Sequence, residues 1–314
     1  MMRPRVTTRS KPAAGRTWFA VLLIAIFAAA GVCAAIPTAE LRPLFILSEG
    51  LALPSDVAVG RDGRIYVVDS GNHRIAVFQR GGKRLSTFAS RGSGPGQLRD
   101  PVGIGIDPSG QVYVADKGNH RIQIFSADGA HVRAWAVKAG GKDVAPVDVA
   151  VDAAGKTVYV TGNSNHKVMA FSPDGRLLQQ WGGEGVNRGE FRYPATIAVG
   201  ADGRVYVVDV LNTRVQVRDP DGSFYMVGEW GVLPGQLFRP KGVALDRQGR
   251  VYVSDSYLDV VQVFSSAYQF LHVLGSGGKP QALTSAAGIA VDNDNRLYVA
   301  EMLKHRVTVF ELPP

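Results

Sequence analysis

The sequence is poor in cysteine and contains no region of strong excess charge outside its N-terminus. Cys33 is the single cysteine among 314 residues, so the chain cannot form an internal disulfide framework or a cysteine-ligated metal site. Hydrophobic residues make up 46% of the chain and charged residues 20%, which excludes both a disordered protein and a polytopic membrane protein. The 37 glycines follow no three-residue period and therefore indicate many turns rather than collagen. The length fits two ordinary domains or one large all-β domain.

The formal net charge of +8 is concentrated at the N-terminus. Five basic residues and no acidic residue occur in positions 1–17. Without these five, 30 basic residues stand against 27 acidic ones, a net charge of +3. A phosphate-binding surface needs a stronger basic excess, so we predict no nucleic-acid partner.

Residues 18–35 form an apolar segment without a charged residue. With the basic residues 1–17 before it and small residues at its end, this segment has the pattern of a secretory signal peptide. It is also long enough to span a bilayer as an uncleaved anchor helix. The basic side of such a segment stays in the cytoplasm, so we expect the rest of the chain to be extracytoplasmic, in the periplasm or at the cell surface. Cys33 follows Val32, whereas a lipoprotein acceptor cysteine follows a small residue.

An internal repeat fills the chain after the apolar segment. Six tyrosines recur at intervals of 46 or 47 residues: Tyr66, Tyr113, Tyr159, Tyr206, Tyr252 and Tyr298. In the first copy, strands are predicted at residues 57–59, 65–68 and 75–78, with an Asp-Gly turn between the first two. A fourth strand ending in an aromatic residue follows. Four antiparallel strands in each of six copies predict an all-β, six-bladed β-propeller over residues 41–314.

The sixth copy lacks its fourth strand. It ends with the apolar residues 307–310, whereas an extra apolar segment, Leu44–Leu47, precedes the first copy. We therefore predict that residues 44–51 complete the last blade, with Phe45 near Val309, so that the propeller closes without open edges.

The loop sequences resemble a known repeat family. Asn72-His73-Arg74-Ile75, Asn119-His120-Arg121-Ile122 and Asn165-His166-Lys167-Val168 are similar to the NHL repeat, as are the Gly-Gln-Leu linkers at 96–98 and 235–237. The resemblance covers about residues 44–310. It implies a six-bladed propeller that recognises a protein, RNA or a small ligand, and it includes some enzymes.

An acid three places after the tyrosine recurs with a base eight places after it. The pairs are Asp69 with Arg74, Asp116 with Arg121, Asp209 with Arg214, and Glu301 with Arg306. An exposed pair of this kind contributes only about 0–1 kcal/mol, so we expect these pairs mainly to fix the shape of the loop. The repeated histidines occupy equivalent positions around the ring, too far apart to share one metal ion.

Candidate binding residues lie where the repeat varies. In a propeller, the start of the innermost strand and the loop between the second and third strands share one face. We therefore expect six residues near the mouth of the central channel: Asp56, Asp148, Thr196, Lys241, Tyr257 and Asp259.

Three classes of function follow from these patterns. We expect an exported, membrane-anchored binding or sensor module that takes an unknown protein, peptide or small ligand on its loop face. No catalytic residues and no cofactor are predicted for it. The alternative is a metal-dependent enzyme similar to peptidyl-hydroxyglycine amidating lyases or to propeller lactonases, with Zn²⁺ or Ca²⁺ as cofactor. The histidines of such lyases directly follow the blade-opening prolines, and here those positions hold other residues. RNA binding, the third class, is disfavoured by the charge and by the export segment.

Overall fold

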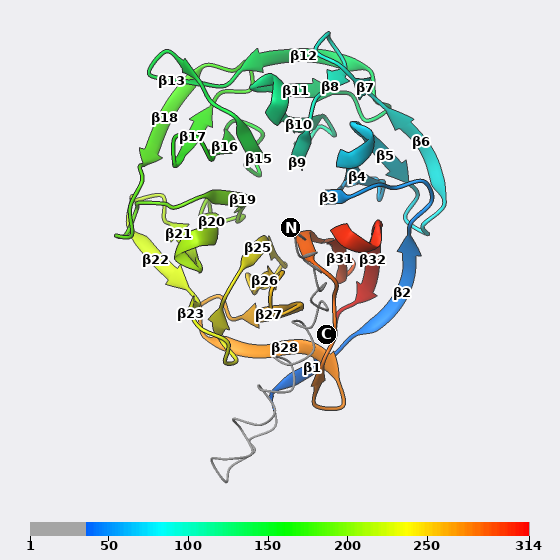
Figure 1. Ribbon diagram of the computed structural model, residues 1–314, viewed down its shortest axis with the longest axis vertical. Coiled ribbons are helices and arrows are strands. Elements are labelled where there is room, and N and C mark those ends of the chain that lie inside the picture. The colour runs from blue at the N-terminus through cyan, green and yellow to red at the C-terminus, as the bar shows by residue number, and fades with distance from the viewer. Residues whose placement is uncertain (1–35, 314) are drawn as a thin grey trace, which may run out of the picture. The chain divides into compact units, whose positions relative to one another are not determined.

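The computed structural model describes residues 36–313, which form a ring of six sheets around a central axis, each built on four long antiparallel strands (Figure 1). The fifth sheet has two short strands in addition. Each sheet is one blade, with its first strand at the axis and its last at the rim. Blade 1 comprises β3 (Pro54–Val59), β4 (Ile65–Asp69), β5 (Arg74–Phe78) and β6 (Arg84–Phe88). Blade 2 comprises β9 (Pro101–Ile106), β10 (Val112–Asp116), β11 (Arg121–Phe125) and β12 (His131–Ala136). Blade 3 comprises β15 (Pro146–Val151), β16 (Val158–Gly162), β17 (Lys167–Phe171) and β18 (Leu177–Gly182).

Blades 4 to 6 repeat this plan. Blade 4 comprises β19 (Pro194–Val199), β20 (Val205–Asp209), β21 (Arg214–Arg218) and β22 (Phe224–Val227). Blade 5 comprises β25 (Pro240–Leu245), β26 (Val251–Asp255), β27 (Val260–Phe264) and β28 (Phe270–Ser276). Blade 6 comprises β30 (Ala286–Val291), β31 (Arg296–Glu301), β32 (Arg306–Glu311) and β2 (Arg42–Leu47). The predicted six-bladed all-β propeller is confirmed.

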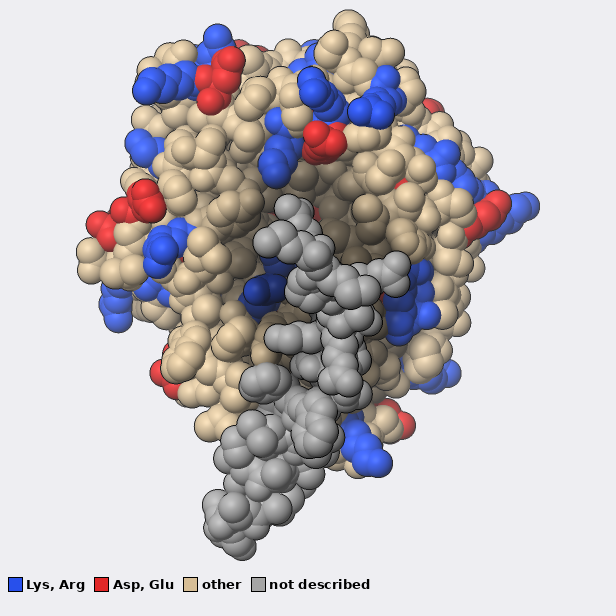
Figure 2. Space-filling model, in the orientation of Figure 1, with Lys and Arg blue, Asp and Glu red and all other residues tan. Residues whose placement is uncertain are grey.

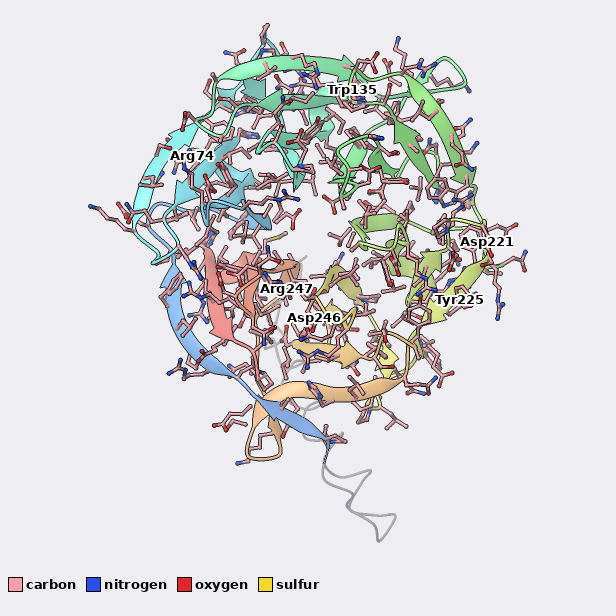
Figure 3. The ribbon with its side chains drawn as sticks, turned by 180° about the vertical axis from the view of Figure 1, so that it is seen from behind. Arg74, Trp135, Asp221, Tyr225, Asp246 and Arg247 are labelled. Atoms are coloured by element: carbon pink, nitrogen blue, oxygen red, sulfur yellow. The ribbon has the colours of Figure 1, made fainter. Side chains whose placement is uncertain are left out.

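The repeated tyrosines belong to the packing between blades. Tyr252 and Tyr298 are at most 2% exposed, and their hydroxyls donate to Asp246 Oδ2 at 3.0 Å and Asp292 Oδ2 at 2.8 Å. Each of these acids follows the first strand of its own blade, and Figure 3 shows Asp246 close to the centre of the ring. A buried tyrosine of this kind fills an apolar space while its hydroxyl fixes the adjacent turn.

The N-terminal strand closes the ring, but over Arg42–Leu47 rather than over the predicted residues 44–51. β2 pairs antiparallel with β32, and Phe45 lies opposite Val309. Just before it, β1 (Thr38–Glu40) pairs in parallel with β28 of blade 5, and the Val273 N–H donates to Pro37 O at 2.9 Å. The sequence analysis did not predict β1. Residues 37–47 thus join blades 5 and 6 along the rim, and the strands of the propeller begin before residue 41.

Short elements connect the long strands. They are the 3-10 turns η1 (Ser70–Asn72), η2 (Lys117–Asn119), η3 (Val210–Asn212) and η4 (Met302–Lys304), and the strands β7 (Ser90–Arg91), β8 (Gln97–Leu98), β13 (Lys138–Ala139), β14 (Lys142–Asp143), β23 (Glu229–Trp230), β24 (Gln236–Leu237) and β29 (Lys279–Pro280). Within residues 36–313, no helix is long and apolar enough to cross a membrane. The predicted segments 1–17 and 18–35, with the signal or anchor helix, lie outside the described residues.

Candidate binding site

The loop face is the side of the ring that carries the connections between the second and third strands of the blades. In blades 1 and 6 this connection is a 3-10 turn followed by a histidine in the left-handed conformation, with φ of 52° at His73 and 53° at His305. The Asp100 N–H donates to His73 Nδ1 at 3.1 Å, and the Leu53 N–H donates to His305 Nδ1 at 3.0 Å. Because Asp100 and Leu53 lead into the next blades, these histidines link neighbouring blades.

The acid–base pairs are more buried than expected. The arginine Nε atoms donate to the acids at 2.7, 2.7, 3.1 and 2.6 Å in Asp69–Arg74, Asp116–Arg121, Asp209–Arg214 and Glu301–Arg306. All four acids are fully buried, which corrects the expectation of exposed pairs. The cause is the linker before each blade: the Ala52 N–H, for example, donates to Asp69 Oδ1 at 2.6 Å, and Arg74 Nη2 donates to Gly50 O at 2.7 Å. The pairs do fix the loops, through the backbone of these linkers.

Three buried glutamines, which the sequence analysis missed, complete these linker contacts. Gln123 Oε1 accepts the Gly96 N–H at 3.0 Å, while Gln123 Nε2 donates to Gln97 O and to Asp116 Oδ2 at 3.0 Å. Equivalent bonds hold the linkers of blades 4 and 5 through Gln216 and Gln262. The pattern was visible in the sequence, because each glutamine lies ten residues after a repeat tyrosine.

The innermost strands bring two of the predicted site residues together. In β3 and β15 the pairing shifts register directly after the opening proline, and such a bulge re-aims the side chains beside it. Asp56 Oδ2 accepts the N–H of Ile104 in blade 2 at 3.0 Å, and Asp148 Oδ2 accepts the N–H of Ile197 in blade 4 at 2.8 Å. A Cβ at Gly103 would overlap Asp148, so the glycine of blade 2 makes room for this carboxyl group.

The carboxyl groups of Asp56 and Asp148 interact directly, and both residues are buried, at 6% and 3% exposure. Burial and the neighbouring Asp148 raise the pKa of Asp56 well above its ordinary value. Burial also raises the pKa of Asp148 to about 7, against hydrogen bonds from Ile197 and Val149 that lower it. Two adjacent buried carboxyls cannot both ionise cheaply, so the pair retains a proton near neutral pH. The two residues therefore form a buried acid pair and not an exposed part of the channel mouth.

Thr196 and Lys241 lie near the starts of the innermost strands of the adjacent blades 4 and 5. Thr196 Oγ1 donates to Lys241 O, so the hydroxyl connects blade 4 to blade 5. The Lys241 side chain is partly buried; burial and, next, the nearby Arg239 lower the pKa of its ammonium group, while Asp255 opposes this. Figure 2 shows the central hollow on one face of the ring, with lysine and arginine side chains in and around it.

Tyr257 and Asp259 lie in the connection of blade 5 and have different surroundings. The Tyr257 ring stacks on Phe238 with 4.2 Å between the ring centroids, and Tyr257 is 42% exposed. Asp259, at φ 57°, accepts the Ser285 N–H through Oδ1 at 3.0 Å. Asp259 thus takes the linking role of the repeat histidines between blades 5 and 6. Ligand binding by these two residues, as by Asp56, Asp148, Thr196 and Lys241, stays a prediction.

One repeat position divides the loop face into two halves. Five residues after the tyrosine, blades 1 to 3 have Gly71, Gly118 and Ser164, whereas blades 4 to 6 have Leu211, Tyr257 and Leu303. Tyr193 and Leu53, which directly precede the opening prolines of blades 4 and 1, flank this half. These five apolar residues are 39–56% exposed, and we call them the apolar arc: Tyr193, Leu211, Tyr257, Leu303 and Leu53.

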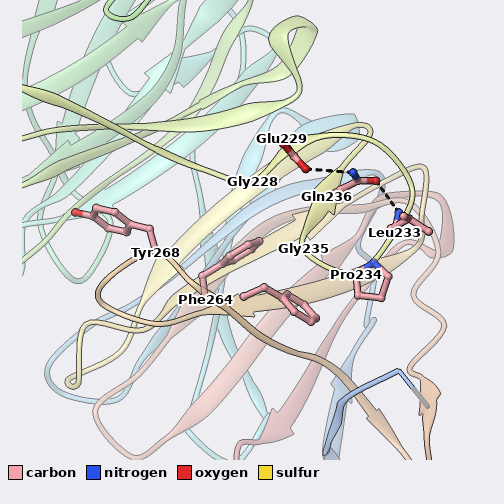
Figure 4. Close-up of a pocket in the computed structure, with 9 residues that line it drawn as sticks. Gly228, Glu229, Leu233, Pro234, Gly235, Gln236, Phe264 and Tyr268 are labelled. Atoms are coloured by element: carbon pink, nitrogen blue, oxygen red, sulfur yellow. Dashed lines mark hydrogen bonds between the residues drawn. The ribbon is translucent and has the colours of Figure 1, made fainter. Parts of the chain in front are cut away.

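A separate pocket of about 350 Å³ lies between the linker into blade 5 and the strands of that blade. Its lining includes Phe264, Tyr268 and Glu229, and Figure 4 shows Gln236 bridging Glu229 and the Leu233 N–H, at 3.3 and 3.1 Å. The carboxylate of Glu229 is thus engaged by the linker itself. This pocket lies beside the fourth strands of blades 4 and 5, and Tyr225, labelled in Figure 3, belongs to the same rim of the ring.

The described residues do not fit a bound zinc or calcium ion. Between residues 36 and 313, no group of three or more His, Cys, Asp or Glu side chains is placed to hold a metal. Asp56 and Asp148 supply two carboxyls, whereas Ca²⁺ takes about six to eight oxygen ligands.

Comparisons with known proteins agree with the fold. The NHL repeat pattern matches residues 51–78 and 98–125. A gluconolactonase from Xanthomonas campestris is 17% identical, with a TM-score of 0.67 over 89% of this chain and 97% of that chain. Virginiamycin B lyase from Staphylococcus aureus, solved with quinupristin, is 15% identical, with a TM-score of 0.62 over 87% and 88%. The WD40 repeats of RRP9 are 14% identical, with a TM-score of 0.61 over 88% and 99%. A comparison with curated protein sequences found no match. At these identities the likeness shows the fold alone.

Proposed function

We propose that this chain, a six-bladed β-propeller with NHL repeats, is an exported binding or sensor module that takes a protein ligand on its loop face. The apolar arc is the observation that carries this proposal. Leu211, Tyr257 and Leu303 are half-exposed at a repeat position where the other three blades have glycine or serine. Large apolar residues that are exposed on one part of a protein surface are typical of a site for another molecule.

Site-specific photocrosslinking tests this function. A photoreactive amino acid placed at Leu211 or Leu303 in the full chain, in its own cells, is expected to form a discrete crosslinked product. The matched control positions are Leu85 and Leu178, which are 45% and 47% exposed on fourth strands of blades 1 and 3. Equal crosslinking at all four positions, or none at the arc, would reject the loop face as the binding surface.

We further propose that residues 18–35 export the propeller and that it acts outside the cytoplasm, anchored to the membrane. The basic residues 1–17 followed by an uncharged apolar segment support this. Alkaline phosphatase fused after residue 314 is expected to be active, since this enzyme folds only after export, and carbonate washing is expected to leave the fusion in the membrane fraction. An inactive fusion would reject export, and a fully released one would reject the anchor.

A metal-dependent lactonase or lyase is the second candidate. The acid pair of Asp56 and Asp148 favours it, because a carboxyl group whose pKa is about 7 is suited to general acid catalysis. The described donor groups do not make a metal site, which favours the binding module. Metal analysis of the purified full chain separates the two functions: stoichiometric zinc or calcium would favour the enzyme.

A further inference from the structure

Lys241 differs from the residues at the same position of the other blades. The position after the blade opening holds small or apolar residues there: Ser55, Val102, Val147, Ala195 and Ala287. Burial and the neighbouring Arg239 both lower the pKa of Lys241. Asp255 is the carboxylate that opposes this shift, by raising the pKa of Lys241. Taking a cation partly out of water costs folding free energy, so packing alone does not explain a lysine here.

The acid nearest to Lys241 is already satisfied by the backbone. Asp255 Oδ2 accepts the N–H groups of Phe238 and Arg239 at 2.7 and 2.9 Å. Asp255 Oδ1 accepts the N–H groups of Tyr257 and Leu258, both at 3.0 Å. Four amide donors use the hydrogen-bonding capacity of this carboxylate, and its single negative charge offsets only one of the two cations, Lys241 and Arg239.

An aromatic surface lies near these cations, because Arg239 and Tyr257 both donate their backbone N–H groups to Asp255. Phe238 directly precedes Arg239 in the chain, and its ring carries the stacked, half-exposed ring of Tyr257. Tyr257 is also the central member of the apolar arc. Blade 5 therefore presents positive charge next to exposed apolar surface, a combination that complements a carboxylate beside an apolar side chain.

We propose that Lys241 and Arg239 receive an acidic side chain from a peptide segment of the partner protein, whose neighbouring apolar side chain packs on Phe238 and Tyr257. This rests on the proposed function, because it names the chemistry of the ligand at the same face. Charge complementarity selects an acidic segment, since the two cations and the one carboxylate of Asp255 leave a net positive charge that repels a basic segment.

A displayed library of random twelve-residue peptides tests the proposal on the immobilised full-length protein. The peptides selected are expected to contain Asp or Glu beside Leu, Ile or Phe. A selected peptide should bind Lys241→Met about tenfold more weakly, as expected for one lost charge pair, and Lys241→Arg should retain most of the affinity. Binding to the wild type should weaken with added salt, and binding to Lys241→Met should respond much less.

Lys167→Met is the matched control, because it removes one positive charge from the start of a third strand in blade 3, outside the apolar arc. It should bind like the wild type, and neither Met variant should melt at a lower temperature than the wild type. Peptides without an acidic residue, or equal binding to Lys241→Met and the wild type, would overturn this inference while leaving the binding function intact. Failure to select any peptide on the loop face would reject both.

Discussion

At the scale of the residue, we expect the acid pair of Asp56 and Asp148 to make the stability of the folded chain depend on pH. Burial raises both pKa values, so between about pH 4 and pH 7 the folded chain holds more protons than the unfolded chain. The stabilising contribution of the shared proton is therefore present at acidic pH. It is lost as the pH rises through the folded-state pKa of about 7.

We predict that Asp56→Asn flattens this pH dependence. The amide keeps a hydrogen-bond donor towards Asp148 but removes the like charge, so the variant should be more stable than the wild type at pH 8 by about 2 kcal/mol. Urea unfolding at pH 5 and pH 8 measures the difference. Asp143→Asn, an exposed substitution, should leave the free energy of unfolding unchanged at both pH values. If the free energy of unfolding of Asp56→Asn varied with pH as in the wild type, the acid pair would not control this pH dependence.

The buried ion pairs predict a second contrast. Arg121 is 17% exposed and bonds the fully buried Asp116, whereas Arg42 is 68% exposed and pairs with the exposed Glu311. Arg121→Met should lower the free energy of unfolding by about 3 kcal/mol, because it leaves a buried carboxylate without its cation. Arg42→Met should lower it by about 0.5 kcal/mol or less. Equal losses of unfolding free energy in the two variants, measured by chemical denaturation, would contradict the difference in burial between the two ion pairs.

The sequence predicts these pairs but not their surroundings. Repetition revealed Asp116 with Arg121, since both recur at fixed distances from a tyrosine. Their burial depends on a linker that folds back over the carboxylate, and no local pattern encodes that contact. The meeting of Asp56 and Asp148 likewise depends on bulges in two blades and on the missing side chain of Gly103 between them.

Among the strands, β2 determines how the ring closes. Leu47 is 1% exposed in the core between blades 6 and 1, while the neighbouring Ile46 is 50% exposed. Leu47→Ala should therefore cost about 3 kcal/mol of unfolding free energy, and Ile46→Ala less than about 1 kcal/mol. Thermal unfolding of the two variants gives the comparison. A larger loss at Ile46 than at Leu47 would mean that the opposite face of β2 packs on the blade.

The role of β2 could be predicted because the sixth copy of the repeat lacks a strand that the N-terminus supplies. The role of β1 could not. Thr38–Glu40 has only three residues, and its partner β28 lies more than two hundred residues away and runs parallel to it. A parallel pair at this separation has no turn to indicate it.

In the whole molecule, the two halves of the loop face differ although the blades share one plan. The alignment that reveals the repeat also contains the contrast between Gly71, Gly118 and Ser164 and the three apolar residues opposite. Tyr257 could be predicted from the sequence but Leu211 and Leu303 could not, because leucine does not by itself indicate exposure. Only the fold shows that all three lie on the surface of consecutive blades.

A variant that lacks the apolar side chains of blades 4 to 6 tests whether the apolar arc binds a partner. The triple variant Leu211→Ser, Tyr257→Ser, Leu303→Ser gives blades 4 to 6 side chains like those of blades 1 to 3. Because all three residues are half-exposed, the variant should fold with near wild-type stability. The measurement is the yield of partner crosslinked through a photoreactive residue at Tyr193, at the end of the arc. We predict that the yield falls to background in the folded triple variant, and an undiminished yield would contradict binding by the apolar arc.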